Sequence, residues 1–192
     1  MKSRYRLLFP HGVGNLSTRT DASLTAPYAA SFTGPAPEVS ETPGVVSIDY
    51  PRFKLFQWAR TSAEITLNPA YPWTIEVHGG VAHWTADLAP IELAGVEVHG
   101  GLSQVDLTLP EPRGTVRFYV SGGASRLTLR RPSGTGARLS VGGGASKLGL
   151  DDQFLSAVGG PIRLQTAAAS ASDGTYEIEI GGGASRLAVS TR

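Results

Sequence analysis

Cysteine is absent from this chain of 192 residues, and charged residues make up only 17% of it. The missing thiols exclude disulfide bridges, cysteine nucleophiles and zinc sites built from cysteine. The charged share is below the usual value of about a quarter, and the net charge at neutral pH is +1. A nearly neutral chain has little attraction for phosphate backbones, so we expect no nucleic acid partner.

Long apolar runs are also missing. The opening "MKSRYRLLFPHGVG" has three consecutive apolar residues before Pro10, which is too short for the apolar core of a signal peptide. No run approaches the roughly 18 apolar residues of a membrane helix. We therefore expect a cytoplasmic protein without a transmembrane segment, and the residues leave contact with a membrane surface open.

Catalytic signatures are missing as well. The sequence has four histidines but no G-x-S-x-G, no H-E-x-x-H and no Walker loop. Its glycine pairs are not followed by a helical pattern, which a phosphate cradle requires. We therefore expect no enzyme activity and no cofactor.

Glycine is abundant, with 24 residues, and it recurs in pairs. The pairs fall at residues 79–80, 100–101, 122–123, 143–144 and 182–183, and the first four are 21, 22 and 21 residues apart. The segments "VSGGASRLTL", "VGGGASKLGL" and "IGGGASRLAV" are nearly the same ten residues. We interpret "VGGPIRLQT" (158–166) as a degenerate copy that Pro161 disturbs.

Each copy has alternating apolar and polar residues on both sides of its glycines. This period of two is typical of strands with one buried face, and Gly-Gly allows a tight bend with positive φ. The pattern predicts an all-β fold: a single-domain β-solenoid of about nine 21-residue coils with little helix. A meander of antiparallel hairpins is the alternative, but near-identical copies favour stacking.

Residues 1–70 are less regular than residues 71–192, which hold the GG-A-S repeats. Strand-like segments such as "GVVSIDY" (44–50) and "AEITLN" (63–68) still alternate. We interpret them as irregular coils that cap one continuous domain over residues 1–192. A domain boundary near residue 70, at "LNPAYPW", is the alternative.

The "GGAS-[RK]-L-x-L" units, together with "FTGPAPEV" and "GVVSIDYPRF", resemble a bacterial family of "putative adhesin" or toast-rack β-solenoid domains. Members occur in cell-envelope stress proteins and in uncharacterised actinobacterial proteins. The resemblance implies a non-enzymatic scaffold or protein-interaction module, in envelope-stress or regulatory signalling.

Three basic residues share one offset after the glycines: Arg126, Lys147 and Arg186, with Gln104 and His83 in earlier copies. Stacked copies would place them in a row that binds an acidic partner or serves only solubility. A column of Glu76, Glu97 and Glu179 could balance this row. A catalytic carboxylate pair is the less favoured interpretation of that column.

The segment "YPRFKLFQWAR" (50–60) gathers aromatic and basic residues. Phe53, Phe56 and Trp58 are therefore candidate interaction residues, or part of a lid over an apolar surface. They complete the candidate set with Arg126, Lys147 and Arg186.

Two further groups contain residues that can bind metal. His78 and His99 share an offset in consecutive copies and could approach Asp87, Asp106 or Glu97, but their spacing matches no established motif and predicts no metal site. In "DDQF" (151–154), neighbouring carboxylates point to opposite faces, so we expect a turn.

These observations favour a scaffold that binds a protein partner or associates with itself. An adhesive or carbohydrate-binding module using Trp58, Trp73 and Trp84 is the alternative, although alternation with Leu88 points Trp84 inward. A β-helix enzyme is a third hypothesis.

Overall fold

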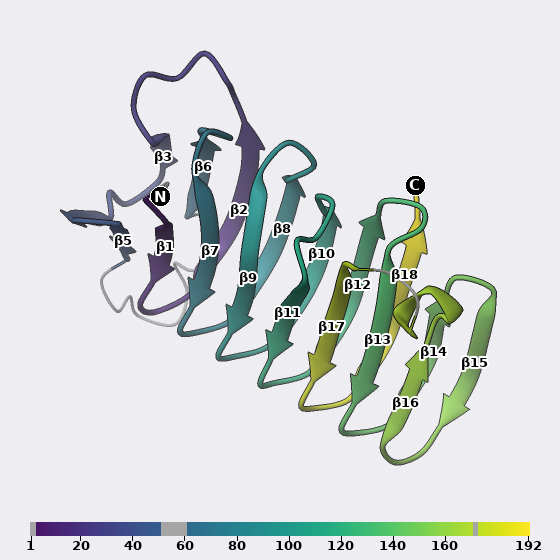
Figure 1. Cartoon of the computed structure of the whole chain (residues 1–192). Helices are drawn as coiled ribbons and strands as arrows, with labels where there is room; N and C mark the ends of the chain where they lie inside the picture. The colour runs from purple at the N-terminus through teal and green to yellow at the C-terminus, as the bar shows by residue number, and fades with distance from the viewer. Residues whose placement is uncertain (1–2, 51–60, 171–172) are drawn as a thin grey trace.

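The computed structural model describes residues 3–50, 61–170 and 173–192, which form two facing nine-stranded β-sheets (Figure 1). Sheet A has, in spatial order, β16 (Ile162–Gln165), β13 (Gly136–Val141), β17 (Thr175–Ile180), β11 (Thr115–Val120), β9 (Glu92–Val98), β7 (Pro72–Val77), β1 (Tyr5–Phe9), β5 (Val45–Asp49) and β4 (Glu38–Thr42). Sheet B has β15 (Gln153–Val158), β14 (Ala145–Leu150), β18 (Ala184–Thr191), β12 (Ala124–Arg131), β10 (Leu102–Thr108), β8 (Val81–Asp87), β2 (Val13–Thr20), β6 (Ser62–Leu67) and β3 (Tyr28–Thr33).

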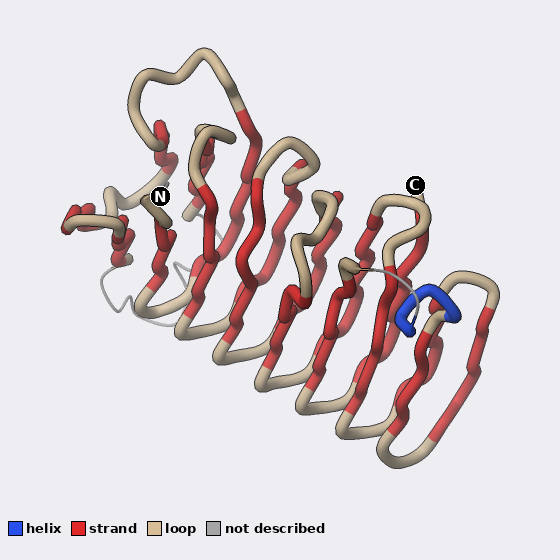
Figure 2. The backbone as a smooth tube through the Cα atoms, viewed as in Figure 1, coloured by secondary structure: helices blue, strands red, loops and turns tan. Residues whose placement is uncertain are grey.

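Strands dominate the described residues, whose helix is limited to the short 3-10 turn η2 (Ala167–Ser170) (Figure 2). The expectation of an all-β chain with little helix is confirmed. Within the same residues, no helix has the length and apolarity needed to cross a membrane.

A repeating unit consists of a strand in sheet A, a glycine corner and the next strand in sheet B. The units that carry the five regular glycine pairs are β7/β8, β9/β10, β11/β12, β13/β14 and β17/β18. Neighbouring units pair in parallel and in matched register, so that Val105 lies opposite both Trp84 and Leu127. Equivalent residues therefore form rows across each sheet, with about 4.8 Å between neighbouring strands.

The order of the units in space differs from their order in the chain. The last unit, β17/β18, lies between β11/β12 and β13/β14 in both sheets. The unit β1/β2 is likewise inserted between β5/β6 and β7/β8. There Tyr5 pairs with Trp73, the last residue of the segment "LNPAYPW". Both ends of the described chain thus contribute strands to the interior of the sheets (Figure 1).

The outermost strands run in the opposite direction to the repeating units. β15 and β16 pair antiparallel with β14 and β13, and β3 and β4 pair antiparallel with β6 and β5. The glycines at 159–160 therefore lead from sheet B back to sheet A, so that the degenerate copy at 158–166 forms a corner between the same two sheets but runs in reverse. The reversal begins at the turn after β14, where Asp151 has a φ of +52°.

Close contact between neighbouring corners explains the regular glycine pairs. Positive φ angles were expected there, but the described glycines of these five pairs are outside that region. A Cβ on Gly100 would lie 2.4 Å from the carbonyl carbon and oxygen of Gly79, and one on Gly122 would lie 2.7 Å from the oxygen of Gly100. The Gly122 amide also donates to the Gly100 carbonyl at 3.0 Å. The first glycine of each pair recurs because a Cβ there would lie within 2.8 Å of the backbone of a neighbouring corner and push the units apart.

The core lies between the two sheets and is built from the inward residues of nearly every strand. Trp73 and Trp84 are among its largest members, with 0% and 1% of their surface exposed. The inward position predicted for Trp84 is confirmed, and neither of these rings is available to stack on a sugar.

Candidate functional site: a basic ladder on one outer face

The candidate site is on the outer face of sheet B and arises from a local break in alternation. In β12, Ala124 and Leu127 are buried while both residues between them, Ser125 and Arg126, are exposed. The units β10, β14 and β18 follow the same inward–outward–outward–inward pattern. Two consecutive outward residues per unit produce two adjacent rows on this face.

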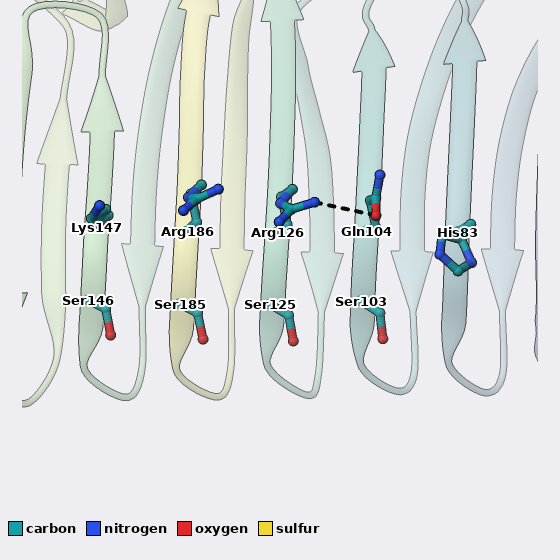
Figure 3. A pocket seen from close by; sticks show the side chains of 9 residues that line it. All are labelled: His83, Ser103, Gln104, Ser125, Arg126, Ser146, Lys147, Ser185 and Arg186. Carbon is teal, nitrogen blue, oxygen red and sulfur yellow. Dashed lines mark hydrogen bonds between the residues drawn. The ribbon is translucent and has the colours of Figure 1, made fainter.

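One row is basic and the other carries hydroxyl groups (Figure 3). We call Arg126, Arg186 and Lys147, in that spatial order, the basic ladder. The serine row, nearer the glycine corners, consists of Ser103, Ser125, Ser185 and Ser146. Both rows line one open hollow, which His83 and Gln104 extend.

The basic ladder has no carboxylate partner within the described ranges. Arg126 Nη1 donates to Gln104 Oε1 at 3.4 Å, and no ion pair there involves Arg126, Arg186 or Lys147. Because strands in a sheet are about 4.8 Å apart, three like charges repel one another weakly through solvent. The ladder is thus an uncompensated basic surface with hydroxyl donors alongside it.

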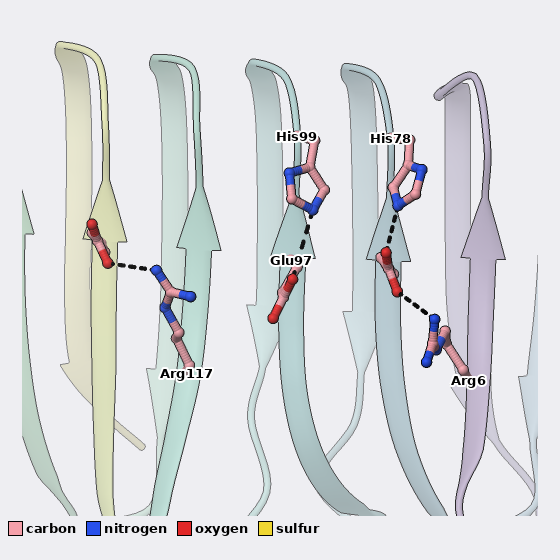
Figure 4. Close-up of polar contacts among 7 residues, drawn as sticks. Arg6, His78, Glu97, His99 and Arg117 are labelled. Carbon is pink, nitrogen blue, oxygen red and sulfur yellow. Dashed lines mark hydrogen bonds and ion pairs between the residues drawn. The ribbon is translucent and has the colours of Figure 1, made fainter.

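The outer face of sheet A is different, because its charges are paired (Figure 4). The acidic column runs Glu76, Glu97, Tyr119, Glu179 and Ser140 across five units. Each of its carboxylates has a local partner: Arg6 Nη1 lies 3.3 Å from Glu76, His99 3.6 Å from Glu97, and Arg117 3.0 Å from Glu179. The hydrogen bond to Glu179 raises the pKa of Arg117 above its ordinary value. The column therefore does not balance the basic ladder, which faces away from it on the other sheet.

A histidine cluster lies at the end of this acidic column. The rings of His78 and His99 have centroids 5.1 Å apart and are nearly perpendicular, at 87°. Glu76 completes the cluster: its carboxylate contacts His78 Nε2, and one donor atom from each of the three residues lies within 4.8 Å of the others. Of the carboxylates considered from the sequence, Glu97 lies beside His99, while Asp87 and Asp106 belong to sheet B. The tripeptide E-V-H occurs at 76–78 and 97–99, and its i, i+2 spacing could have identified Glu76.

The remaining predicted residues fall elsewhere. Asp151 is in the turn expected for "DDQF", and its carboxylate pairs with Arg131, whose side chain is 2% exposed. Phe53, Phe56 and Trp58 lie outside the described residues. In the described part of the chain, the candidate site therefore consists of the basic ladder and the serine row.

Comparison with known proteins identifies a solved structure with a similar fold. No protein-family model matches the sequence, and no curated protein matches it. The structure is similar to that of a protein from Clostridium sporogenes ATCC 15579 described as a "putative cell adhesion protein", with a TM-score of 0.71 and 20% sequence identity. The match covers 99% of this chain and 92% of that one. The likeness establishes a shared fold and is consistent with the resemblance to adhesin-type domains.

Proposed function

We propose that this chain is a non-enzymatic β-solenoid that acts as a protein-interaction module, with the basic ladder as the surface that holds an acidic partner. The two facing sheets and their alternating strands support the solenoid interpretation. The hydrogen-bonded sheet holds the backbones of the ladder residues at strand spacing, so that only their side chains have to be ordered when an extended acidic segment binds.

The observation that carries this proposal is the lack of a carboxylate partner for the ladder. On sheet A, by contrast, arginines stand beside carboxylates, as Arg117 beside Glu179 and Arg138 beside Glu177 illustrate. On sheet B, Arg126, Arg186 and Lys147 stand together beside the serine row. A surface kept only for solubility has no need of a hydroxyl row that can donate to the same acidic groups.

An adhesive role is the second candidate. The description of the structural neighbour as a cell adhesion protein favours it, and the burial of Trp73 and Trp84 removes two residues that a carbohydrate-binding form would use. An envelope-stress or regulatory role rests on the family resemblance. In all these settings the basic ladder is the contact surface that we propose.

Binding of a fluorescein-labelled decaglutamate peptide, followed by anisotropy at low salt, tests the proposal. Replacing Arg126, Lys147 and Arg186 together by Gln should weaken binding about tenfold, because three contacts of about 0.5 kcal/mol each sum to roughly the 1.4 kcal/mol of one decade. Added salt should weaken binding to the unaltered chain, since exposed charges are screened.

The matched control removes three arginines from sheet A instead: Arg117, Arg138 and Arg163, each replaced by Gln. This variant has the same net charge as the ladder variant, and we expect it to bind like the unaltered chain. Equal loss in both variants would show that only net charge matters. Tight binding of heparin without any binding of decaglutamate would favour the adhesive candidate over the acidic protein partner.

A further inference from the structure

Glu76, His78 and His99 form a cluster of metal-ligating groups on the face opposite the basic ladder. One donor atom from each residue lies within 4.8 Å of the other two. Glu76 is the next-to-last residue of β7, and its side chain belongs to the outward row. His78 and His99 directly follow the ends of β7 and β9. The three groups thus come from two neighbouring, hydrogen-bonded strands, which hold their backbones in place.

We propose that this cluster binds one divalent transition-metal ion of the zinc type through Glu76, His78 and His99. Two imidazoles and one carboxylate are a donor set that suits Zn²⁺, Ni²⁺ and Cu²⁺ rather than Mg²⁺ or Ca²⁺, which prefer oxygen ligands. Zinc binds such atoms at about 2.0–2.1 Å. The donors must therefore draw closer, and the two histidine side chains, 45% and 44% exposed, have the rotameric freedom to do so.

Two surrounding residues lie beside the ligands. Arg6 Nη1 pairs with Glu76 Oε2 at 3.3 Å, while Oε1 of the same carboxylate faces His78. Glu97 lies 3.6 Å from Nε2 of His99. Arg6 thus holds the carboxylate of Glu76, whereas the 3.6 Å contact of Glu97 is longer than a hydrogen bond and becomes an outer-shell contact only if the two side chains draw closer.

A surface hydrogen bond between His78 and Glu76 would be the simpler explanation of the cluster. That explanation extends to His99, which has its own partner in Glu97, but it does not account for the edge-on contact of His99 with His78 or for its donor atom within 4.8 Å of the Glu76 carboxylate. The motif is also confined to two adjacent units, because the equivalent corner residues of the next ones are Ser121, Gly181 and Gly142. Three protein ligands leave coordination positions open to water or to a donor from another molecule.

Isothermal titration of the tag-free chain with ZnCl₂, and separately with NiCl₂, tests the site. We expect one ion per chain, with His78→Ala and His99→Ala each weakening binding by at least about tenfold, as loss of even outer-shell partners does at metal sites. His83→Ala is the matched control, because His83 is exposed on sheet B and lies outside the cluster. Magnesium should not compete with zinc.

A second readout is the zinc-induced shift of the imidazole resonances in the NMR spectrum. The signals of His78 and His99 should move with zinc and those of His83 should not. The exposed positions make all three variants compatible with folding, which circular dichroism verifies. Absence of zinc binding, or equal zinc affinity for the unaltered chain, His78→Ala and His99→Ala, would overturn the proposal.

Discussion

The two outer faces of this protein are built from the same repeats, yet their charges are arranged in opposite ways. On sheet A, Glu177 of β17 pairs with Arg138 at 3.3 Å, and Glu179 pairs with Arg117 at 3.0 Å. On sheet B, Arg186 of the same unit lies between two further cations. Sheet B also has an ion pair, between Arg130 and Asp106, but the three cations of its basic ladder have no carboxylate partner in the described part of the chain.

The inserted unit β17/β18 produces both arrangements. Without it, Arg117 of β11 and Arg138 of β13 would occupy neighbouring positions, because both are in register with Glu177. The insertion replaces an unfavourable contact between like charges by an Arg–Glu–Arg row. It also adds Arg186 to the ladder on the opposite face. The same inserted unit thus separates two arginines on sheet A and brings a third cation into the row on sheet B.

The largest expected effect comes from a covalent test of this insertion in a chain that has no cysteine of its own. In Ser125→Cys/Ser185→Cys the two cysteines lie on neighbouring strands, whose spacing of about 4.8 Å falls within the Cα–Cα range of a disulfide. In Ser125→Cys/Ser146→Cys they are two strands apart, at about 9.6 Å, which no disulfide spans.

Mild oxidation followed by mass spectrometry of tryptic peptides should find a near-complete intramolecular bridge in the first variant and none in the second. The reverse outcome would mean that the units stack in chain order. The ladder would then run Arg126, Lys147 and Arg186. On sheet A the pair of Arg117 with Glu179 would not form, whereas Arg138 and Glu177 would remain neighbours.

A smaller effect is expected when one charge is removed from each face, because the free energy of unfolding should change in opposite directions. Glu177→Gln removes the ion pair with Arg138 while Arg117 keeps Glu179, and we expect it to lower the free energy of unfolding by about 0.2–1 kcal/mol. Arg186→Gln relieves repulsion in the ladder, so we expect stability to be unchanged or to rise by a few tenths, roughly 0.2–0.5 kcal/mol.

Urea denaturation at low salt measures both changes, and high salt should reduce both because these groups are exposed. A clear loss of stability in Arg186→Gln would indicate that Arg186 has a structural partner. That result would weaken the interpretation of the ladder as a surface kept free for binding.

The strands, the corners and the buried apolar residues could be predicted from the sequence because each has a local signal. Alternation identifies strands such as Thr175–Ile180, and Gly-Gly identifies where the chain turns. The inward position of Trp84 follows from the same alternation. Local patterns of this kind depend on residues a few positions apart, which a single sequence displays directly.

The order of the units could not be predicted, because their shared pattern lets any unit pair with any other. Residues such as Arg126 and Arg186 are equivalent in every local respect, and only their long-range neighbours differ. The reversed strands at both ends were missed for a similar reason, since Gly159 and Gly160 resemble a forward corner. The histidine cluster could be predicted only in part: the shared offset brings His78 and His99 together, but whether Glu76 or Glu97 completes the cluster depends on side-chain conformation.

The central claim is that an acidic partner binds sheet B and leaves sheet A free. Titration of the ¹⁵N-labelled chain with decaglutamate, followed by amide chemical shifts, tests this directly in the unaltered protein. The account predicts shifts centred on Ser125–Arg126, Ser185–Arg186 and Ser146–Lys147, with little change in β9, β11 and β17. Shifts centred on those sheet A strands, or spread evenly over both faces, would contradict it.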